Sequence, residues 1–487
     1  MALIDELVSS SSSIEELSNY IDNNSTEIYD FFISQSFQSI SAYRDEIESF
    51  ILLKYKIYSE LDFKKDKNKT FIFGLLDVSE RFGFHSAFER LFDLSKFNKI
   101  SIGSRLKASS KFLVGIHNVL DYSDRLPEIV DLLATSYLQE EDREENVIST
   151  LIHYYTEVLL NFGTHNLASV VHFRSILVEE ISRDDRKFLL NPALLEILNE
   201  SITDIEAAYE TIHLKLDLLL KSSREFLPFE VGSDLIEIET EYVEMLDSVA
   251  SKFQEIRELC KMLYSKVSSD EIFWSLKRGV KVLTDEEQLL AYINSYGNMH
   301  YAKVMSALTS LPNEFFTYQH EIYDWGCGQG LATMCFLEYS QMQDNKVNIK
   351  SATLIEPSEI AIKRAALHVK KFKKDLTIIT INKDLDSIKP DDFKSSEKSI
   401  KIHLFSSILD IDLFYMSDLV SNIKNSFKGF NYFVCVSPYI TDQKTQRLKD
   451  FVENFENYEM LSKITERKGE WKGTNWSRVI RVFKAEI

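Results

Sequence analysis

The stretch Ile-Tyr-Asp-Trp-Gly-Cys-Gly-Gln-Gly at residues 322–330 decides how the second half of this chain is expected to fold. It predicts a buried strand ending in an acid, a tight turn, and a helix that begins near Leu331. Its alternating glycines permit positive φ angles and let a ligand approach bare main chain. The helix start adds unpaired N–H groups and a positive dipole end. Such a turn, after the first parallel strand, is where open α/β sheets bind nucleotides.

The spacing of the glycines excludes two common phosphate-binding motifs. G-x-G-x-x-G would need glycine at position 331 or 333, where the chain has Leu331 and Thr333. No Lys-Ser/Thr pair follows, as a P-loop requires. The pattern that stands here, D-x-G-x-G-x-G, closely resembles the first motif of class I S-adenosylmethionine (SAM)-dependent methyltransferases. The alternative is a glycine turn that only joins strand to helix.

This resemblance covers roughly residues 285–487, which alternate strand and helix as a doubly wound sheet should. It implies a seven-stranded methyltransferase sheet that closes with an antiparallel hairpin. Strands are expected at 321–324, 352–355, 376–381, 400–405, 432–436, 460–466 and 479–484. Helices are expected at 331–339, 358–371, 412–426 and 444–454.

The resemblance also implies which groups bind SAM. In the first motif, Asp324 would hold the turn and the methionine ammonium group, directly or through water. The neighbouring cofactor contacts in that motif would be Gly326, Cys327, Gly328 and Gly330.

The ends of the second and third strands would bind the nucleoside. Glu356, followed by Pro357, would accept hydrogen bonds from the ribose hydroxyls, which a carboxylate does better than a neutral group. Asp384 would accept from the adenine amino group, with the backbone N–H of Leu385 facing the ring. The alternative for both acids is an exposed loop position.

The fourth strand ends at Ser406 and Ser407, whose backbone would line the methionine part of the pocket. A general base is needed only where the acceptor must lose a proton. Asp410, Tyr439 and His403 are the candidates near that edge.

A lead-in helix is expected within residues 284–311. Tyr292, Tyr296, His300 and Lys303 are spaced four, four and three residues apart, so they share one helix face. Many methyltransferases have such a helix before the first strand, laid over the cofactor pocket, and Tyr296, His300 and Lys303 would then contact SAM. The alternative, favoured for Tyr292, is an aromatic stripe packed on the sheet.

Residues 1–283 are expected to form an acidic, all-helical domain, as two sub-bundles or a solenoid, with apolar residues at three- and four-residue steps. Helix breaks are expected near Pro127, at 191–192 and at 228–233. Residues 291–487 carry 26 Lys and Arg against 24 Asp and Glu, which leaves 30 against 52 for residues 1–290. Such an acidic half is a poor nucleic-acid surface and suggests a protein partner. The six histidines of this half lack metal-ligand spacing and are expected to be structural or on the surface: His85, His117, His153, His165, His172 and His213.

Composition favours a cytoplasmic protein. The four cysteines lack C-x-x-C spacing and are interpreted as reduced thiols. No apolar run approaches the roughly 18 residues of a membrane span, and the first residues do not form a signal peptide. No metal site is expected.

The methyl acceptor stays open. Enzymes that methylate base amino groups usually show D/N-P-P-Y/F after the fourth strand, where this chain has Ser-Ser-Ile-Leu at 406–409. That departure argues against methylation of a base amino group and does not exclude RNA or protein targets, so the acceptor is unknown. The lysines at 370–374 could touch phosphate, although a solvated face is the simpler interpretation. Two alternatives to an enzyme of this family remain: a methyltransferase-like scaffold that binds SAM or a partner without methyl transfer, and another nucleotide-binding α/β enzyme such as a dehydrogenase.

Overall fold

The computed structural model describes residues 3–139, 141–183, 191–222, 235–276, 279–343, 347–412, 414–471 and 474–487. Two compact units make up the chain, Met1–Arg224 and Glu225–Ile487. This division falls earlier than the expected boundary between residues 283 and 284. The reason is that helices α15 (Glu241–Ser248) and α16 (Phe253–Tyr264) bury their apolar faces in the same core as the sheet.

The first unit is all-helical, and its buried apolar side chains form one contiguous core from Ile4 to Leu216. That continuity agrees better with one irregular bundle than with separate sub-bundles. Its elements are α1 (Leu3–Ser10), α2 (Ile14–Asn23), α3 (Ser25–Tyr29), the π-helical turn η1 (Asp30–Ser34), α4 (Phe37–Ile40), the 3-10 turn η2 (Ser41–Tyr43), α5 (Arg44–Leu53), α6 (Tyr55–Tyr58), α7 (Asp66–Phe82), α8 (His85–Phe97), α9 (Ser104–Leu113), α10 (Val119–Leu138), α11 (Glu144–Phe162), α12 (Leu167–Ile181), α13 (Pro192–Leu198) and α14 (Ile205–Ser222).

The expected helix breaks have different outcomes. The break near Pro127 is wrong, because Pro127 lies inside α10. Leu126, Ile129 and Val130 beside it are fully buried, so tertiary packing outweighs the lost backbone hydrogen bond. The start at 191–192 is confirmed by α13, which begins at Pro192. The break at 228–233 lies outside the described residues.

The second unit is built on a seven-stranded sheet in the order β3-β2-β1-β4-β5-β9-β6. Neighbouring strands from β3 to β5 pair in parallel, and β9 pairs antiparallel with both β5 and β6. A separate two-stranded pair, β7 with β8, lies in the loop that precedes β9. The strands are β1 (Gln319–Trp325), β2 (Asn348–Ile355), β3 (Thr377–Ile381), β4 (Ile400–Ser406), β5 (Phe430–Ser437), β6 (Glu459–Glu466), β7 (Glu470–Trp471), β8 (Thr474–Asn475) and β9 (Arg478–Glu486).

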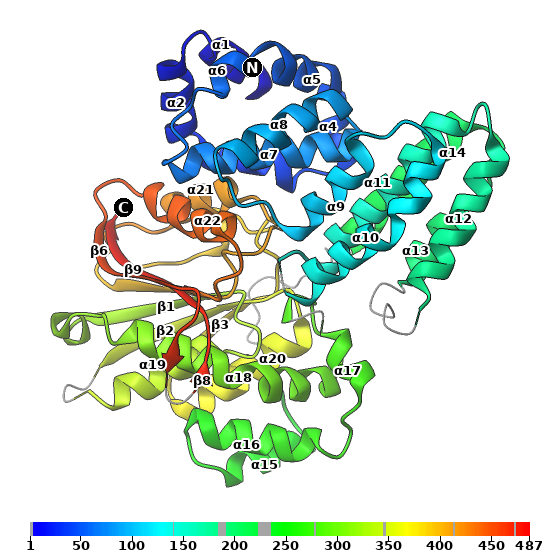
Figure 1. Cartoon of the computed structure of the whole chain (residues 1–487). Coiled ribbons are helices and arrows are strands. Elements are labelled where there is room, and N and C mark those ends of the chain that lie inside the picture. The colour runs from blue at the N-terminus through cyan, green and yellow to red at the C-terminus, as the bar shows by residue number, and fades with distance from the viewer. Residues whose placement is uncertain are drawn as a thin grey trace. The chain divides into compact units, whose positions relative to one another are not determined.

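Helices cover both faces of this sheet (Figure 1). On one face lie α18 (Glu286–Leu308), α19 (Leu331–Gln341) and α20 (Glu359–Phe372), and beyond them α15 and α16. On the other face lie α21 (Met416–Ser426) and α22 (Asp442–Glu453). The remaining helical segments of the unit are α17 (Asp270–Ser275), η5 (Asn313–Thr317) and η6 (Pro390–Asp392).

The strand sequences explain this layering. Side chains alternate between faces, so Ile322 of β1 enters the core under α18–α20, while Tyr323 and Trp325 enter the core under α21 and α22. Both faces are buried, which is why the parallel strands read as nearly unbroken apolar runs. The expected sheet with its terminal antiparallel pair is confirmed. None of the described helices is both long and apolar enough to cross a membrane.

Candidate active site at the carboxyl edge of the sheet

The turn between β1 and α19 has the backbone that its glycines predict. Gly326, Gly328 and Gly330 have φ angles of 61°, 52° and 77°, all in the left-handed region. A Cβ atom on Gly326 would collide with the side chain of Ile408, which packs directly on the turn. A Cβ atom on Gly328 would meet nothing within 4 Å. The main chain at Gly328 is therefore open to a ligand, whereas Gly326 is closed by packing.

Asp324 holds the start of α19. Its Oδ2 accepts from the backbone N–H of Thr333 at 3.1 Å and from the Thr333 hydroxyl at 2.7 Å. Burial raises the pKa of Asp324 to about 6, although both hydrogen bonds favour the charged form. Asp324 was expected to hold the turn, and it does so through these two hydrogen bonds to the first turn of α19. Its contact with an ammonium group stays a prediction.

Glu356 follows β2 and faces the glycine turn. Its Oε2 accepts from the N–H of Gly328 and its Oε1 from the N–H of Ser358, each at 3.0 Å. Burial, reinforced by the nearby charge of Asp324, raises the pKa of Glu356 to about 7. Ser358 caps α20 by accepting from the N–H of Ala361 at 3.2 Å, as expected. These hydrogen bonds thus hold the Glu356 carboxylate beside the open main chain at Gly328.

The end of β3 is tied to the end of β2 by a residue that sequence reasoning did not select. The Asn382 side-chain amide donates to the carbonyl oxygens of Glu356 and Pro357, each at 2.9 Å. An Asn directly after a strand is an ordinary turn signal, so nothing marked this bridge. Asp384, half-buried, accepts from the N–H of Ser387 at 2.8 Å. The side chain of Leu385 packs on the core beneath α21 and α22.

The lead-in helix α18 reaches the end of β4. His300 Nδ1 lies 2.9 Å from the Ser406 hydroxyl, and His300 Nε2 lies 3.3 Å from the Tyr292 hydroxyl. Burial, together with the nearby charge of Lys303, lowers the pKa of His300 to about 3, so this imidazole is neutral. The ring of Tyr296 lies 5.4 Å from that of Tyr292.

Tyr292 belongs with these polar groups and not only with the packed stripe that was favoured for it. Burial and the charges of Glu356 and Asp410 all raise its pKa. Its hydroxyl lies 3.3 Å from His300 Nε2, and the same imidazole reaches Ser406 at the end of β4.

Asp410 lies at the ends of β4 and β5. Its Oδ1 accepts from the Ser437 hydroxyl at 2.7 Å, and burial raises its pKa. The charge of Lys303, itself 2% exposed, acts in the opposite direction on this pKa. Ser407 has a positive φ of 59°, rare for a residue with a side chain, and donates its N–H to the Val436 carbonyl at 2.7 Å. Sequence reasoning did not select Ser437, whose place at the carboxyl end of the parallel strand β5 was the signal that could have found it.

The other two base candidates are His403 and Tyr439, and of these His403 does not lie with the groups above. His403 lies inside β4, where it accepts from Trp325 Nε1 at 3.2 Å and its Nε2 lies 3.0 Å from Asn431 Oδ1. Its side chain is on the face covered by α21 and α22, and burial lowers its pKa to about 3. The Tyr439 hydroxyl donates to Asp442 at 2.9 Å.

Three buried carboxyl groups therefore gather at one sheet edge, from Asp324, Glu356 and Asp410, and burial raises the pKa of each. Such an edge favours a cationic ligand, which would stabilise the ionised carboxylates. Among the residues that the structure describes, no group of three or more His, Cys, Asp and Glu is arranged to hold a metal ion.

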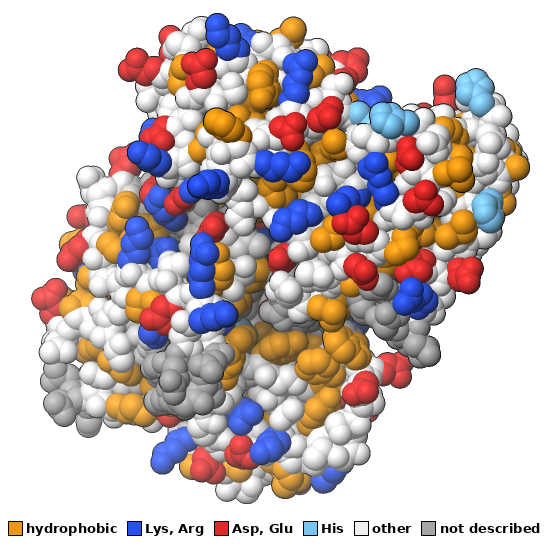
Figure 2. Space-filling view, in the orientation of Figure 1, with side chains coloured by type: hydrophobic (Ala, Val, Ile, Leu, Met, Phe, Trp, Pro, Cys, Tyr) orange, Lys and Arg blue, Asp and Glu red, His pale blue; other side chains and the backbone are white. Residues whose placement is uncertain are grey.

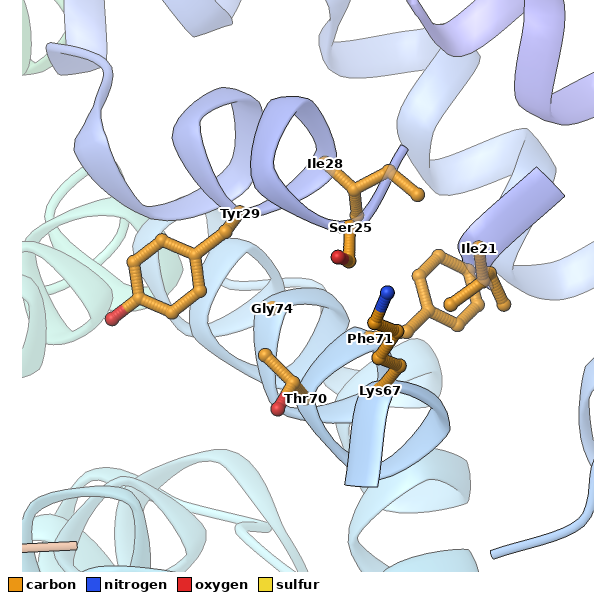
Figure 3. Close-up of a pocket in the computed structure, with 8 residues that line it drawn as sticks. All are labelled: Ile21, Ser25, Ile28, Tyr29, Lys67, Thr70, Phe71 and Gly74. Atoms are coloured by element: carbon orange, nitrogen blue, oxygen red, sulfur yellow. The ribbon is translucent and has the colours of Figure 1, made fainter. Parts of the chain in front are cut away.

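The first unit contains a small cavity between α2, α3 and α7, with a volume of about 10 Å³ (Figure 3). That volume holds about one water molecule and no substrate. Its lining residues are Ile21, Ser25, Ile28, Tyr29, Lys67, Thr70, Phe71 and Gly74.

The histidines of the first unit have structural or surface positions. His85 Nε2 lies 2.7 Å from Glu157 and His153 Nδ1 lies 2.9 Å from Glu80. The ring of His213 is stacked on that of Phe37 at 3.9 Å. The other three are exposed: His117, His165 and His172.

Comparison with known proteins gives distant structural likeness. No protein-family model and no curated protein matches the chain. A SAM-dependent O-methyltransferase from Thermotoga maritima is 11% identical, with 40% of this chain and 71% of that chain covered and a TM-score of 0.26. The plantazolicin methyltransferase in complex with SAH is 13% identical, with 47% of this chain and 98% of that chain covered and a TM-score of 0.30. A putative class I SAM-dependent methyltransferase from Listeria monocytogenes is 13% identical, over 75% and 89%, with a TM-score of 0.30.

Because these sequence identities and TM-scores are low, the fold is described from the features of the chain itself. These are the parallel sheet with its antiparallel end pair, and the glycine turn that follows β1. By these features the second unit resembles the seven-stranded, mostly parallel sheet with a terminal antiparallel pair that was expected for class I SAM-dependent methyltransferases.

Proposed function

We propose that the second unit binds SAM at the carboxyl edge of its sheet and directs transfer of the SAM methyl group to an acceptor. One observation carries the proposal: the Glu356 carboxylate is fixed by hydrogen bonding to Gly328, beside open left-handed main chain. The Glu356 carboxylate can accept hydrogen bonds from two hydroxyl groups, and the main chain at Gly328 beside it leaves space for a ligand. A dehydrogenase would need the glycine spacing that positions 331 and 333 lack.

Each part of SAM has a matching group in the proposal. Glu356 would hold the ribose hydroxyls, Asp384 the adenine amino group, and Asp324 the ammonium group. His300 and Tyr296 of α18 would cover the methionine end. When bound, SAM supplies a methyl group activated by its sulfonium charge. The protein contributes orientation, exclusion of water, and carboxylates near that charge.

Asp410 is the proposed general base. When an acceptor takes the methyl group that bound SAM would supply, the Asp410 carboxylate would accept the proton that the acceptor loses. Its hydrogen bond from Ser437 orients the carboxylate, and its raised pKa makes it a better base than an ordinary aspartate.

The first unit is proposed to select or position the acceptor, which would be an RNA or a protein. The acidic balance of residues 1–290 favours a protein partner over a polyanion. On the face that Figure 2 shows, Lys and Arg side chains lie among Asp and Glu side chains, so both signs of charge are available there.

The proposed location is the cytoplasm, where the four buried cysteines would remain thiols.

Isothermal titration with SAM, and with its demethylated product SAH, tests the proposal. We expect micromolar binding by the wild type and a loss of at least about tenfold in Glu356→Gln, because removing a charged hydrogen-bond acceptor costs about 1.5–3 kcal/mol. Glu321→Gln is the control, since Glu321 is also buried but lies near the opposite, amino end of β1, where it pairs with Lys350 at 2.6 Å.

Absence of SAM binding by the wild type would contradict the proposal. The alternative function, a SAM-binding scaffold, makes a different prediction. If the protein is an enzyme, Asp410→Asn should lower methyl transfer by a much larger factor than it lowers SAM affinity. If it is a scaffold, the wild type should bind SAM and transfer no methyl group to any offered RNA or protein.

A further inference from the structure

A buried chain of hydrogen bonds links α15 to the glycine turn. The Tyr242 hydroxyl lies 2.7 Å from His368 Nε2, and His368 Nδ1 lies 2.9 Å from the backbone oxygen of Gln329. Tyr242 is 2% exposed, and His368 and Gln329 are fully buried. The three residues come from α15, from α20 and from the turn itself, so the chain joins parts that are far apart in the sequence.

The direction of the chain follows from its last member. A carbonyl oxygen can only accept, so Nδ1 of His368 carries the proton, Nε2 is the acceptor, and the Tyr242 hydroxyl donates to it. Burial, and then the charge of Arg364, lowers the pKa of His368 to about 3, while burial raises the pKa of Tyr242. Both groups are therefore neutral at ordinary pH, and the chain keeps one arrangement.

Arg364 holds Tyr242 in place. Its guanidinium carbon lies 3.5 Å from the centre of the Tyr242 ring, a cation–π contact. The same guanidinium donates to Glu237 at 2.8 Å and to Glu286 at 3.2 Å. The ring thus has little freedom to move away from His368.

The peptide between Gln329 and Gly330 is held at both ends. Its carbonyl accepts from His368, and its N–H, on Gly330, donates to the Cys327 carbonyl at 2.7 Å. The Gln329 side chain adds a third tie by donating to the Leu289 carbonyl of α18 at 2.9 Å. Since Gly328 precedes this peptide by one residue, a fixed peptide plane limits the conformations open to the main chain that faces Glu356.

We infer that Tyr242 and His368 are positioning residues for the cofactor-binding turn. This inference rests on the proposed SAM site and adds to it: the helix α15 takes part in cofactor binding without touching the cofactor. Holding the turn before binding lowers the ordering cost of binding. The turn is then already in its binding conformation in the free protein.

Three variants test the inference: Tyr242→Phe, His368→Leu and His368→Asn. Tyr242→Phe keeps the ring under Arg364 and removes only the hydroxyl. His368→Leu removes both hydrogen bonds. His368→Asn places an amide N–H near the position of Nδ1 and can again donate to Gln329, so it is the rescue variant.

The first measurement is backbone amide exchange at residues 328–330 in the free protein. We expect faster exchange in Tyr242→Phe and His368→Leu, and slower exchange in His368→Asn than in His368→Leu. The second measurement is SAM affinity, expected to fall about 5- to 10-fold in Tyr242→Phe, the effect of one lost buried hydrogen bond, and by more in His368→Leu, which loses two. His368→Asn should recover part of that loss.

Tyr58→Phe is the control for general loss of stability. Tyr58 is fully buried in the first unit, and its hydroxyl also makes a 2.7 Å hydrogen bond, to the Ile51 carbonyl. At a matched change in melting temperature, this variant should leave SAM affinity and exchange at residues 328–330 unchanged. Equal effects in Tyr58→Phe and Tyr242→Phe, or no rescue by His368→Asn, would overturn the inference. Absence of SAM binding by the wild type would instead contradict the proposed function, while the exchange measurement would still test the positioning.

Discussion

The raised pKa of Glu356 predicts that SAM binding depends on pH in a defined direction. Only the ionised carboxylate accepts from both ribose hydroxyls. With a pKa of about 7 in the free protein, about 9% of Glu356 is ionised at pH 6 and about 91% at pH 8. SAM affinity should therefore rise about tenfold between these pH values, because binding selects the ionised form.

Proton release provides a second measure of the same effect. Binding at pH 6 should release about 0.9 proton from Glu356, and binding at pH 8 about 0.1. Calorimetry in buffers of different ionisation enthalpy measures this number directly. Glu356→Gln is the control, since the amino group of SAM titrates equally with both proteins and only Glu356 differs. Equal pH dependence in the wild type and Glu356→Gln would refute the reasoning.

The same pKa shift has an opposite consequence for the stability of the free protein. A folded pKa above the ordinary value means that the folded state holds the proton more tightly than the unfolded chain does. The stability contributed by protonated Glu356 and Asp324 is thus complete below the ordinary carboxyl pKa, and is lost as the pH rises through about 6 for Asp324 and about 7 for Glu356.

Three further substitutions have expected outcomes. Gly328→Asp should abolish SAM binding while circular dichroism shows unchanged helix content, because the new side chain enters open space beside the bound ligand; unchanged affinity would remove the turn from the site. Gly326→Ala should lower the free energy of unfolding by about 1–3 kcal/mol in denaturant titrations, since its φ is positive and the new methyl group collides with Ile408; a wild-type midpoint would show that the turn relaxes. Arg105→Ala should destabilise the first unit by about 3–5 kcal/mol, because it leaves the buried Asp77 carboxylate without its main partner; a change below about 1 kcal/mol would contradict this account.

The sheet and its edge could be predicted because their signals are local. Asp324 and Glu356 each end a strand, and parallel strands bring their carboxyl ends together whatever the rest of the chain does. The seven expected strands overlap the seven strands of the main sheet, with differences confined to their ends, and the short pair β7 and β8 was not expected.

Other features depended on long-range packing that no local pattern specifies. The amphipathic sequences of α15 and α16 predict that each helix buries one face. They do not predict that this face packs in the core of the second unit's sheet. The Tyr242–His368 hydrogen bond spans 126 residues. His403 lies only three residues before the end of β4. Because side chains alternate between the two faces of a strand, Leu404 faces the core under α18–α20 and His403 faces the core under α21 and α22.

The place of β9 has a consequence for the synthesis of this protein. β9 follows β6 in the chain but lies between β5 and β6 in the sheet. While the ribosome is still making residues 478–486, β6 has no strand to pair with, and the outer edge of β5 is open. Both exposed edges could pair with a neighbouring nascent chain. The sheet of this unit therefore cannot be completed until β9, which pairs with both β5 and β6, has left the ribosome.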